Sequence, residues 1–135
     1  MPNYGRLQCK HISGPEVDCL ARSQKNSTSS FKIKGIIDTG ATITCLPSSA
    51  IDKLIENAYL EYTVMDVEDF SGAVHEMKIY RIHLNLEGWG EEVEVVSYAG
   101  KYAIIGRDIL NDLKVILDGP GKVWMVDQKP SGANP

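Results

Sequence analysis

The chain has 135 residues and a mass of 14.9 kDa, which is the size of one ordinary domain with a single core. A formal net charge of −4 argues against a protein that holds nucleic acid through bulk positive charge. No apolar run reaches the ~18–20 residues that span a bilayer, and the first residues lack the apolar stretch of a signal peptide. We therefore expect a cytoplasmic protein without a membrane segment.

The three cysteines, Cys9, Cys19 and Cys45, form no CxxC pair and do not group with the three histidines at the spacing of zinc ligands. An odd number of scattered cysteines fits a reducing compartment better than a disulfide framework. We expect neither a structural metal nor a disulfide, and we interpret Cys45 as a small core residue because it lies in an apolar run.

The order of apolar and polar residues predicts mainly β structure. Strands are expected at residues 17–23, 31–37, 43–46, 59–67, 78–86, 91–96 and 102–105, with a last hairpin formed by residues 115–117 and 123–126. Ser48 and Ser49 can cap a helix over residues 50–56, and apolar residues at helical spacing predict a second helix over 107–113. We expect His83 to be a surface imidazole.

Acidic residues are concentrated in one part of the chain. Residues 50–98 carry three Lys or Arg and eleven Asp or Glu. One interpretation is a set of solvated strand faces. The alternative is an acidic rim around a binding cleft, for which Asp66, Glu68 and Asp69 are the best candidates.

Asp38-Thr39-Gly40 follows the apolar segment Gly35-Ile36-Ile37 and precedes Ala41 and a further apolar run. Its carboxylate should stand at a turn that emerges from the core, where it is partly desolvated, and a glycine lets the backbone lie close to a ligand. The tripeptide alone is also compatible with an ordinary turn in which Asp38 bonds its own backbone.

A second segment, Ile104-Ile105-Gly106-Arg107-Asp108-Ile109-Leu110, begins 66 residues after Asp38 and reads as a buried strand that leads into a helix. Together with Ile36-Ile37-Asp38-Thr39-Gly40-Ala41-Thr42 it closely resembles the two signature segments of retropepsin-like aspartic proteases. The resemblance covers roughly residues 16–126. It implies an all-β fold, a closed acid-protease β-barrel with one or two short helices.

The resemblance also implies an aspartic endopeptidase. An aspartic protease needs two facing carboxylates, and this chain has one aspartate in an Asp-Thr-Gly setting. The expected active form is therefore a homodimer in which each subunit contributes Asp38. By the resemblance, Thr39 bonds across the dyad, Gly40 leaves room for substrate backbone, and no metal or cofactor takes part. The expected substrate is an extended peptide or polyprotein.

Residues 65–78 occupy the place of the family's flap hairpin, which closes over the substrate. Phe70, Ser71, Gly72 and Ala73 would form its tip, with backbone N–H groups free to bond substrate, and Ala41 and Ile104 would also contact the substrate. An ordinary hairpin turn is the alternative for this segment.

Four further residues of the second segment, Ile105, Gly106, Arg107 and Asp108, are expected to support the catalytic loop. In the family the arginine bonds an acidic residue just after that loop. Thr42 and Ile43 follow Ala41 here, so we expect Asp108 or a backbone carbonyl to take the place of the acid.

We expect an N-terminal extension or dimer strand at residues 1–15, the protease domain at 16–127 and a flexible tail at 128–135. The alternative function is a catalytically silent module of the same fold that dimerises or binds peptides. A phosphohydrolase is disfavoured because neither a second aspartate nor a glycine-rich phosphate loop accompanies Asp38.

Overall fold

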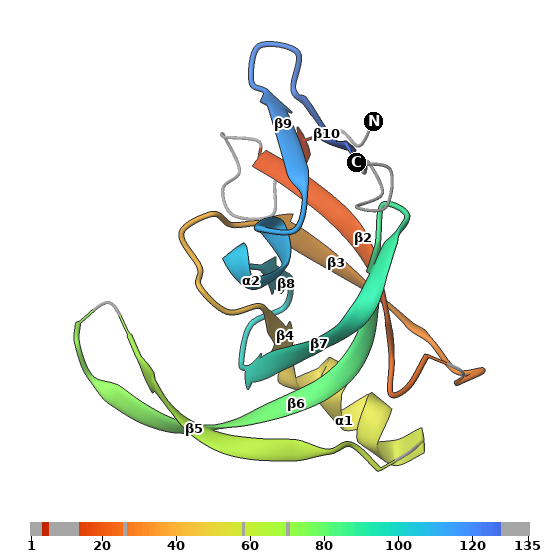
Figure 1. Cartoon of the computed structure of the whole chain (residues 1–135), viewed down its shortest axis with the longest axis vertical. Coiled ribbons are helices and arrows are strands. Elements are labelled where there is room, and N and C mark those ends of the chain that lie inside the picture. The colour runs from red at the N-terminus through yellow and green to blue at the C-terminus, as the bar shows by residue number, and fades with distance from the viewer. Residues whose placement is uncertain (1–3, 6–13, 26, 58, 70, 128–135) are drawn as a thin grey trace, which may run out of the picture.

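The computed structural model describes residues 4–5, 14–25, 27–57, 59–69 and 71–127. Within these ranges the chain is mostly β, with two short helices (Figure 1). The expectation of a mainly β fold with one or two short helices is therefore confirmed. In chain order the elements are β1 (Tyr4–Gly5), β2 (Gly14–Arg22), β3 (Phe31–Ile37), β4 (Cys45–Pro47), α1 (Ser48–Asn57), β5 (Tyr62–Glu68), β6 (Val74–Leu86), β7 (Trp89–Tyr98), β8 (Ala103–Ile105), α2 (Arg107–Leu110), β9 (Lys114–Asp118) and β10 (Val123–Asp127).

Most strands lie where the sequence predicts them, with ends shifted by a few residues, and two elements differ more. β6 begins four residues before the predicted strand because it pairs along the whole of β5, from Tyr62 opposite Tyr80 to Glu68 opposite Val74. The helix predicted over residues 107–113 is a single turn that ends at Leu110, after which the chain turns into β9.

Eight strands form one sheet in the order β1-β2-β3-β8-β4-β7-β6-β5. β2 also pairs with β6 in an antiparallel arrangement, with Cys19 opposite Leu86 and Arg22 opposite His83. This pairing closes the sheet into a ring of six strands, β2, β3, β8, β4, β7 and β6. This ring agrees with the closed fold expected from the sequence. The β5–β6 hairpin extends beyond the ring and bends upward at the left of the view (Figure 1).

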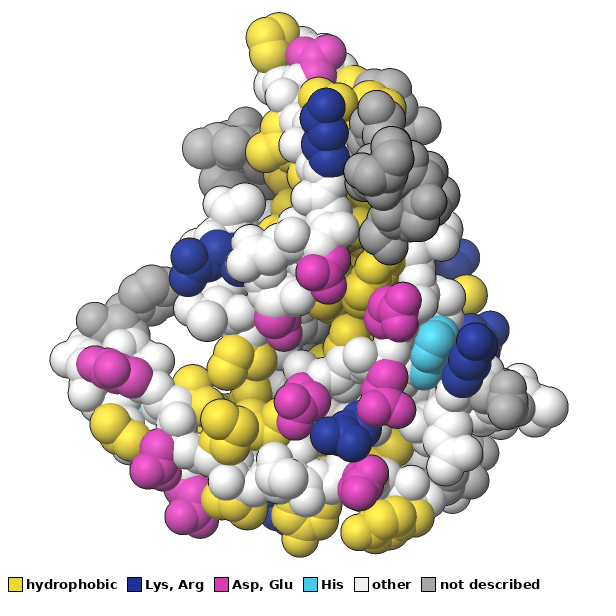
Figure 2. All heavy atoms as spheres, in the orientation of Figure 1, with side chains coloured by type: hydrophobic (Ala, Val, Ile, Leu, Met, Phe, Trp, Pro, Cys, Tyr) yellow, Lys and Arg dark blue, Asp and Glu magenta, His cyan; other side chains and the backbone are white. Residues whose placement is uncertain are grey.

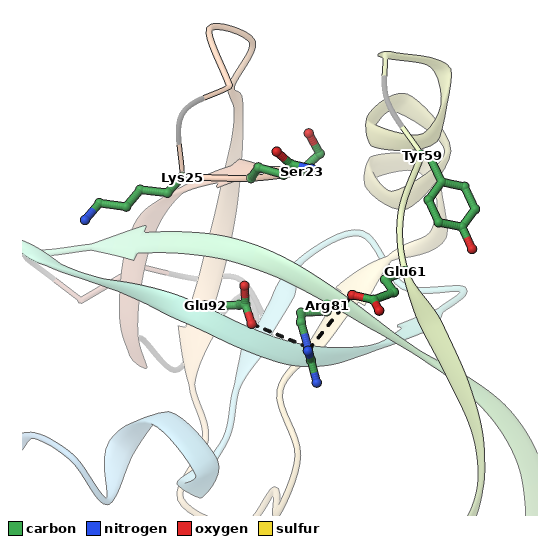
Figure 3. A pocket seen from close by; sticks show the side chains of 7 residues that line it. Ser23, Lys25, Tyr59, Glu61, Arg81 and Glu92 are labelled. Atoms are coloured by element: carbon green, nitrogen blue, oxygen red, sulfur yellow. Dashed lines mark ion pairs between the residues drawn. The ribbon is translucent and has the colours of Figure 1, made fainter.

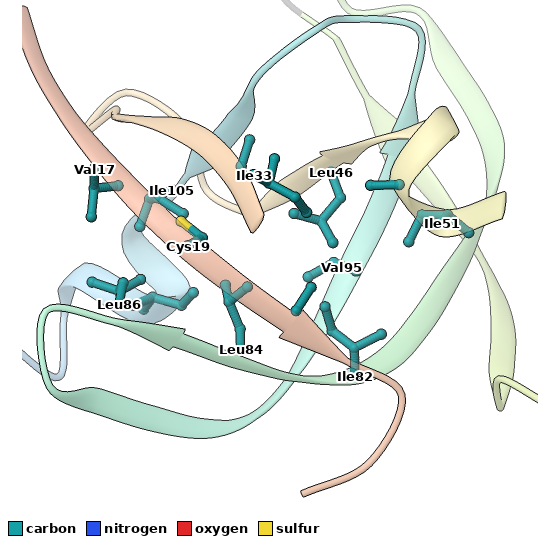
Figure 4. Close-up of a cluster of buried hydrophobic side chains, with 14 of the residues drawn as sticks. Val17, Cys19, Ile33, Leu46, Ile51, Ile82, Leu84, Leu86, Val95 and Ile105 are labelled. Atoms are coloured by element: carbon teal, nitrogen blue, oxygen red, sulfur yellow. The ribbon is translucent and has the colours of Figure 1, made fainter. Parts of the chain in front are cut away.

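The core fills the inside of this ring (Figure 4). Alternate residues of each strand point inward, as the pleat of a strand requires, and α1 covers one end with Ala50, Ile51 and Leu54. The largest fully buried side chains are Trp124, Leu46, Ile51, Leu54, Ile82, Leu84, Leu86, Ile105 and Ile109.

The C-terminal hairpin of β9 and β10 forms a separate two-stranded sheet. Trp124 anchors it to the ring, because its side chain is fully buried in the core and its indole N–H donates to the carbonyl oxygen of Glu16 at 2.8 Å. At the other end of the chain, β1 pairs with the first two residues of β2. The rest of the predicted N-terminal extension up to residue 13, and the predicted tail at 128–135, lie outside the described residues.

The prediction that His83 is a surface imidazole is wrong, since the side chain is only 9% exposed. His83 lies on the outer face of the ring, where Arg22 of β2 and Glu92 of β7 flank it on either side. Gly90 has no side chain to displace it: a Cβ there would lie 3.4 Å from Nε2 of His83. Neighbouring strands on both sides, which periodicity cannot reveal, therefore bury this residue.

Candidate active site

Asp38 follows the last residue of β3 and opens the loop of residues 38–44 that leads to β4, called here the Asp38 loop. Its backbone N–H donates to the carbonyl oxygen of Ile105 in β8 at 2.9 Å, which continues the parallel β3–β8 pairing. Its half-buried carboxylate accepts the N–H of Gly40 at 2.9 Å, and its carbonyl accepts the N–H of Ala41 at 3.2 Å. The carboxylate is therefore held at the end of a rigid strand, on a tight turn.

The segment that follows β8 holds the Asp38 loop from the other side. The N–H of Arg107 donates to the carbonyl of Ala41 at 2.8 Å, and the N–H of Asp108 donates to that of Thr42 at 3.2 Å. Gly106 allows this approach because a Cβ at that position would lie 2.9 Å from both the carbonyl oxygen of Ala41 and the carbonyl carbon of Ile43. The structure thus brings the two signature segments into direct backbone contact.

Thr44 is a part of this junction that the sequence analysis misses. Its side chain is 0% exposed, and its hydroxyl donates to the carboxylate of Asp108 at 2.7 Å while accepting the N–H of Gly106 at 3.1 Å. The second oxygen of the same carboxylate accepts the N–H of Thr44 at 3.1 Å. A threonine inside the apolar run Ile43–Leu46 is the signal that could have revealed it, because a buried hydroxyl needs partners.

The prediction that Arg107 bonds Asp108 or a backbone carbonyl is wrong. Its guanidinium donates to the hydroxyl of Thr42 at 3.1 Å, rather than to Asp108 or a backbone carbonyl. The carboxylate of Asp108 instead accepts hydrogen bonds from Thr44 and from the N–H of Ile109. This contact is exposed to solvent, so it adds less to the anchoring of the loop than the buried Thr44 does.

An apolar row crosses the sheet on the outer face of the ring, beside the Asp38 loop. Five residues on adjacent strands are paired one after another in the sheet register. They are Ile36 of β3, Ile104 of β8, Cys45 of β4, Val96 of β7 and Ile79 of β6. None of these residues belongs to the main core cluster. Since Ile36 precedes Asp38 by two residues, the pleat places the row on the same side of the sheet as the carboxylate.

The sequence predicts that Cys45 is a core residue. In the structure Cys45 is half-buried in the apolar row and is not part of the main core. Burial, and after it the charges of Asp108 and Asp38, raise the pKa of its thiol. The thiol therefore stays protonated and acts as a small apolar side chain on this face.

The turn that joins β5 to β6, residues 69–73, is called here the tip turn. Phe70 lies outside the described residues, and Ser71, Gly72 and Ala73 are exposed. The expectation of free N–H groups is wrong for these three. Gly72, with φ +85°, donates to the Asp69 carbonyl, and the other two N–H groups donate to the Asp69 carboxylate, at 2.9 Å from Ser71 and 3.1 Å from Ala73.

Asp66 and Glu68 share one face of this hairpin, whereas Asp69 bonds to His75, which points to the other face. Asp66 lies opposite Glu76 and Glu68 opposite Val74 in the β5–β6 register, whereas Met65, Val67 and Met77 alternate to the other side. Figure 2 shows acidic side chains spread along the hairpin and hydrophobic ones in the hollow between the hairpin and the body. Asp66 and Glu68 therefore belong to the face turned away from the apolar row, which Ile79 shares with Met77.

Two cavities lie away from Asp38. One, of about 520 Å³, lies beside the start of β5, and Arg81 there pairs with Glu92 at 3.5 Å and with Glu61 at 4.0 Å (Figure 3). The other, of about 340 Å³, lies between the start of β3 and the start of α1. Neither of these two cavities is lined by the Asp38 loop or the tip turn.

In the described part of the chain, no group of three or more His, Cys, Asp or Glu side chains is arranged to hold a metal ion. Neither described helix is both long and apolar enough to cross a membrane.

Both the sequence and the fold of this chain are similar to those of retroviral proteases. The sequence profile of the family described as "Retroviral aspartyl protease" matches residues 13–118. The fold is similar to that of the EIAV protease complexed with the inhibitor HBY-793, with a TM-score of 0.56 and 19% identity over 73% of this chain and 86% of that one. No curated protein sequence matches the chain significantly.

Two foamy virus structures are also similar. The simian foamy virus (mac) protease in solution has a TM-score of 0.50 and 21% identity over 71% of this chain and 91% of that one. The foamy viral protease-reverse transcriptase in complex with an RNA/DNA hybrid has a TM-score of 0.51 and 18% identity over 72% of this chain and 11% of that one. These likenesses establish the retropepsin fold, and because the profile spans well over half of the sequence, the chain belongs to the retroviral aspartyl protease family.

Proposed function

We propose that the protein is an aspartic endopeptidase whose active form is a homodimer with one Asp38 from each subunit. The observation that carries the proposal is the position of Asp38, a half-buried carboxylate on a loop that β8 and α2 hold by backbone hydrogen bonds on both sides. The chain has a single Asp-Thr-Gly, so a second carboxylate of the same kind must come from a second copy.

The proposed chemistry follows from two carboxylates at close range. Two such groups ~3 Å apart cannot both ionise easily, so they share one proton. The ionised carboxylate takes a proton from a water molecule as that water attacks the peptide carbonyl, and the protonated one donates to the carbonyl oxygen. When the tetrahedral intermediate collapses and the C–N bond breaks, the carboxyl group that took the proton from water gives it to the leaving amine. The other carboxylate recovers its proton from the hydroxyl group that becomes the carbonyl of the product acid, and no covalent enzyme intermediate forms.

The residues around Asp38 support this role. Thr39 is exposed next to the carboxylate, where it can bond to the Asp38 loop of the partner subunit. Gly40 donates to Asp38, and a Cβ there would lie 3.2 Å from the carboxylate oxygen, so the glycine keeps the approach to the carboxylate open. Ile105, Gly106, Arg107 and Asp108 act through the loop that they hold.

The proposed substrate is an extended peptide or polyprotein segment with apolar side chains around the cleaved bond. The apolar row places Ile36, Ile104 and Cys45 beside Asp38, and Ala41 lies in the same loop. Ile104 and Cys45 are half-buried and can contact alternate side chains of an extended peptide, whereas Ile36 is buried and supports them from below. The β5–β6 hairpin would cover the peptide with its tip residues Phe70, Ser71, Gly72 and Ala73.

Digestion of a peptide library at pH 4–7 tests the activity, with wild type, Asp38→Asn and a pepstatin-type inhibitor. Asp38→Asn should reduce cleavage by at least about 100-fold. Asp118→Asn is the matched control, because Asp118 also accepts a turn N–H, from Gly121 at 2.9 Å, and it should keep full activity. Equal cleavage by wild type and Asp38→Asn would refute the role of Asp38, and no cleavage by either would favour a silent peptide-binding module.

Sedimentation at micromolar concentration tests the dimer. Activity should rise with the dimer fraction, and an active species that is strictly monomeric would contradict a shared pair of carboxylates.

A further inference from the structure

The tip turn is built around one carboxylate. Oδ1 of Asp69 accepts three hydrogen bonds, from the hydroxyl of Ser71 at 2.6 Å and from the N–H groups of Ser71 and Ala73 at 2.9 and 3.1 Å. Oδ2 accepts Nε2–H of His75 at 2.8 Å. The backbone of Asp69 closes the turn, with its N–H donating to the Ala73 carbonyl and its carbonyl accepting from Gly72, both at 3.0 Å.

These contacts make the tip turn a self-contained unit. Ser71, Gly72 and Ala73 all donate their N–H groups to Asp69, and the described residues show no hydrogen bond from the turn to the ring. Among the described residues, the side-chain hydrogen bonds of the tip turn therefore all converge on the exposed carboxylate of Asp69. The arrangement is not a Ser–His–Asp catalytic triad, because His75 bonds only the aspartate and does not reach the serine.

We propose that Asp69 and His75 are positioning residues that lock the tip turn into one conformation, and that protonation of His75 tightens this lock. The proposal rests on the proposed function in one respect, namely that the β5–β6 hairpin closes over the substrate. A tip that is already ordered when it meets the substrate loses less conformational entropy on closure.

The direction of the pH dependence follows from the two partners. Hydrogen bonds from Ser71 first, and then from His75, hold the pKa of Asp69 well below its usual range, so this carboxylate stays ionised at any pH at which the protein would work. Imidazole side chains take up a proton as the pH falls. With the imidazole protonated the contact is an ion pair, and with it neutral a single N–H donates to the carboxylate. The lock is therefore stronger in acid and weakens as the pH rises.

The charged groups near His75 come from its own hairpin. Asp69 faces it, and Val67 lies opposite it on β5. Asp66, Glu68 and Glu76 are on the other face of the hairpin by strand alternation, so their side chains point away from His75.

The first test measures the tip directly and needs no activity. Amide exchange and ¹⁵N relaxation of Ser71, Gly72 and Ala73 are recorded in the full chain between pH 4.5 and 8. In His75→Gln the tip amides should exchange roughly threefold to tenfold faster than in wild type at pH 5, after correction for intrinsic rates, and about equally at pH 8. Glu76→Gln, one residue away on the other face, should behave as wild type.

Asp69→Asn should loosen the tip at every pH, because an amide oxygen is a weaker acceptor and cannot form the ion pair. Asp66→Asn is its matched control on β5 and should leave the tip unchanged. Equal tip exchange in wild type, His75→Gln and Asp69→Asn at pH 5 would overturn the proposal, as would an equal effect of both control variants.

The second test applies if the protein cleaves peptides. His75→Gln should raise KM at pH 5 by about threefold with kcat within twofold of wild type, and the difference should vanish near pH 8. A fall in kcat at unchanged KM would overturn the positioning role. Amide exchange reports only on the order of the tip turn, whereas kcat depends on the chemistry at Asp38. Failure of this proposal and failure of the proposed function therefore give different results.

Discussion

Two turns of this chain share their local chemistry and differ in their surroundings. In each, an aspartate carboxylate accepts the backbone N–H two residues later, from Gly40 to Asp38 and from Ser71 to Asp69, both at 2.9 Å. The Asp38 loop is also tied to β8 and α2, more than 60 residues away in the sequence. In the described residues the tip turn is tied only to itself.

The comparison shows that the same short-range motif can belong to a fixed or to a movable part. Long-range bonds and the buried Thr44 make the Asp38 loop part of the ring, so opening it would expose buried polar groups. The tip turn can move with its hairpin without breaking any hydrogen bond to the ring that the structure describes. We expect the substitutions below to separate the two turns, in order of decreasing effect.

Gly106→Ala should have the largest effect. The added Cβ would meet backbone atoms of Ala41 and Ile43 at 2.9 Å, and the Asp38 loop would have to shift. We expect a loss of about 2–3 kcal/mol in the free energy of unfolding, measured by denaturant titration, and a loss of any peptidase activity. Gly119→Ala, where nothing lies within 4 Å of the new Cβ, is the control. Unchanged stability of Gly106→Ala would show that this junction is not tightly packed.

Thr44→Val should come next. It keeps the shape of the side chain but leaves the Asp108 carboxylate and the Gly106 N–H without their buried partner. The expected cost is about 1–3 kcal/mol of unfolding free energy, with faster amide exchange in the Asp38 loop. Thr42→Val, which removes one exposed bond to Arg107, should cost less than about 0.5 kcal/mol. Similar costs for the two variants would mean that the buried hydroxyl does not anchor the loop.

Ser71→Ala should affect only the tip. It removes one of the three bonds to Oδ1 of Asp69, and because Ser71 is exposed, the midpoint of global unfolding should not change. Amide exchange at Gly72 and Ala73 should rise about twofold to threefold. A lower global midpoint would mean that the tip and the ring unfold together, which would break the distinction between the two turns.

The smallest effect concerns the Cys45 thiol, on the strand that follows the Asp38 loop. Burial, with the charges of Asp108 and Asp38, raises its pKa, so little thiolate forms near neutral pH. Asp38→Asn removes one negative charge and should speed alkylation of Cys45 about twofold at pH 8. Mass spectrometry separates this site from Cys19, whose pKa burial raises to about 12 and which should resist labelling. A slower reaction in Asp38→Asn would contradict this electrostatic coupling.

Patterns that span a few residues predict much of the fold and part of the candidate site. Alternation of apolar residues marks most strands, and the segments around Asp38 and Gly106 indicate the family, which the sequence profile confirms. Two of the predictions that fail concern partners from elsewhere in the chain. Arg107 bonds Thr42, and His83 is buried between two strands, because cross-strand register decides which side chains meet.

The sequence by itself determines the mainly β fold, the single Asp-Thr-Gly and its position between two apolar strands. Each of these features depends on residues that are close together in the chain. Only the tertiary structure decides that Thr44 and Asp108 clamp the loop, that five strands align an apolar row beside Asp38, and that Asp69 occupies the tip N–H groups. The physical reason is that a hydrogen bond or an apolar contact depends on which atoms meet in space, and for the loop and the row these come from residues far apart in the chain.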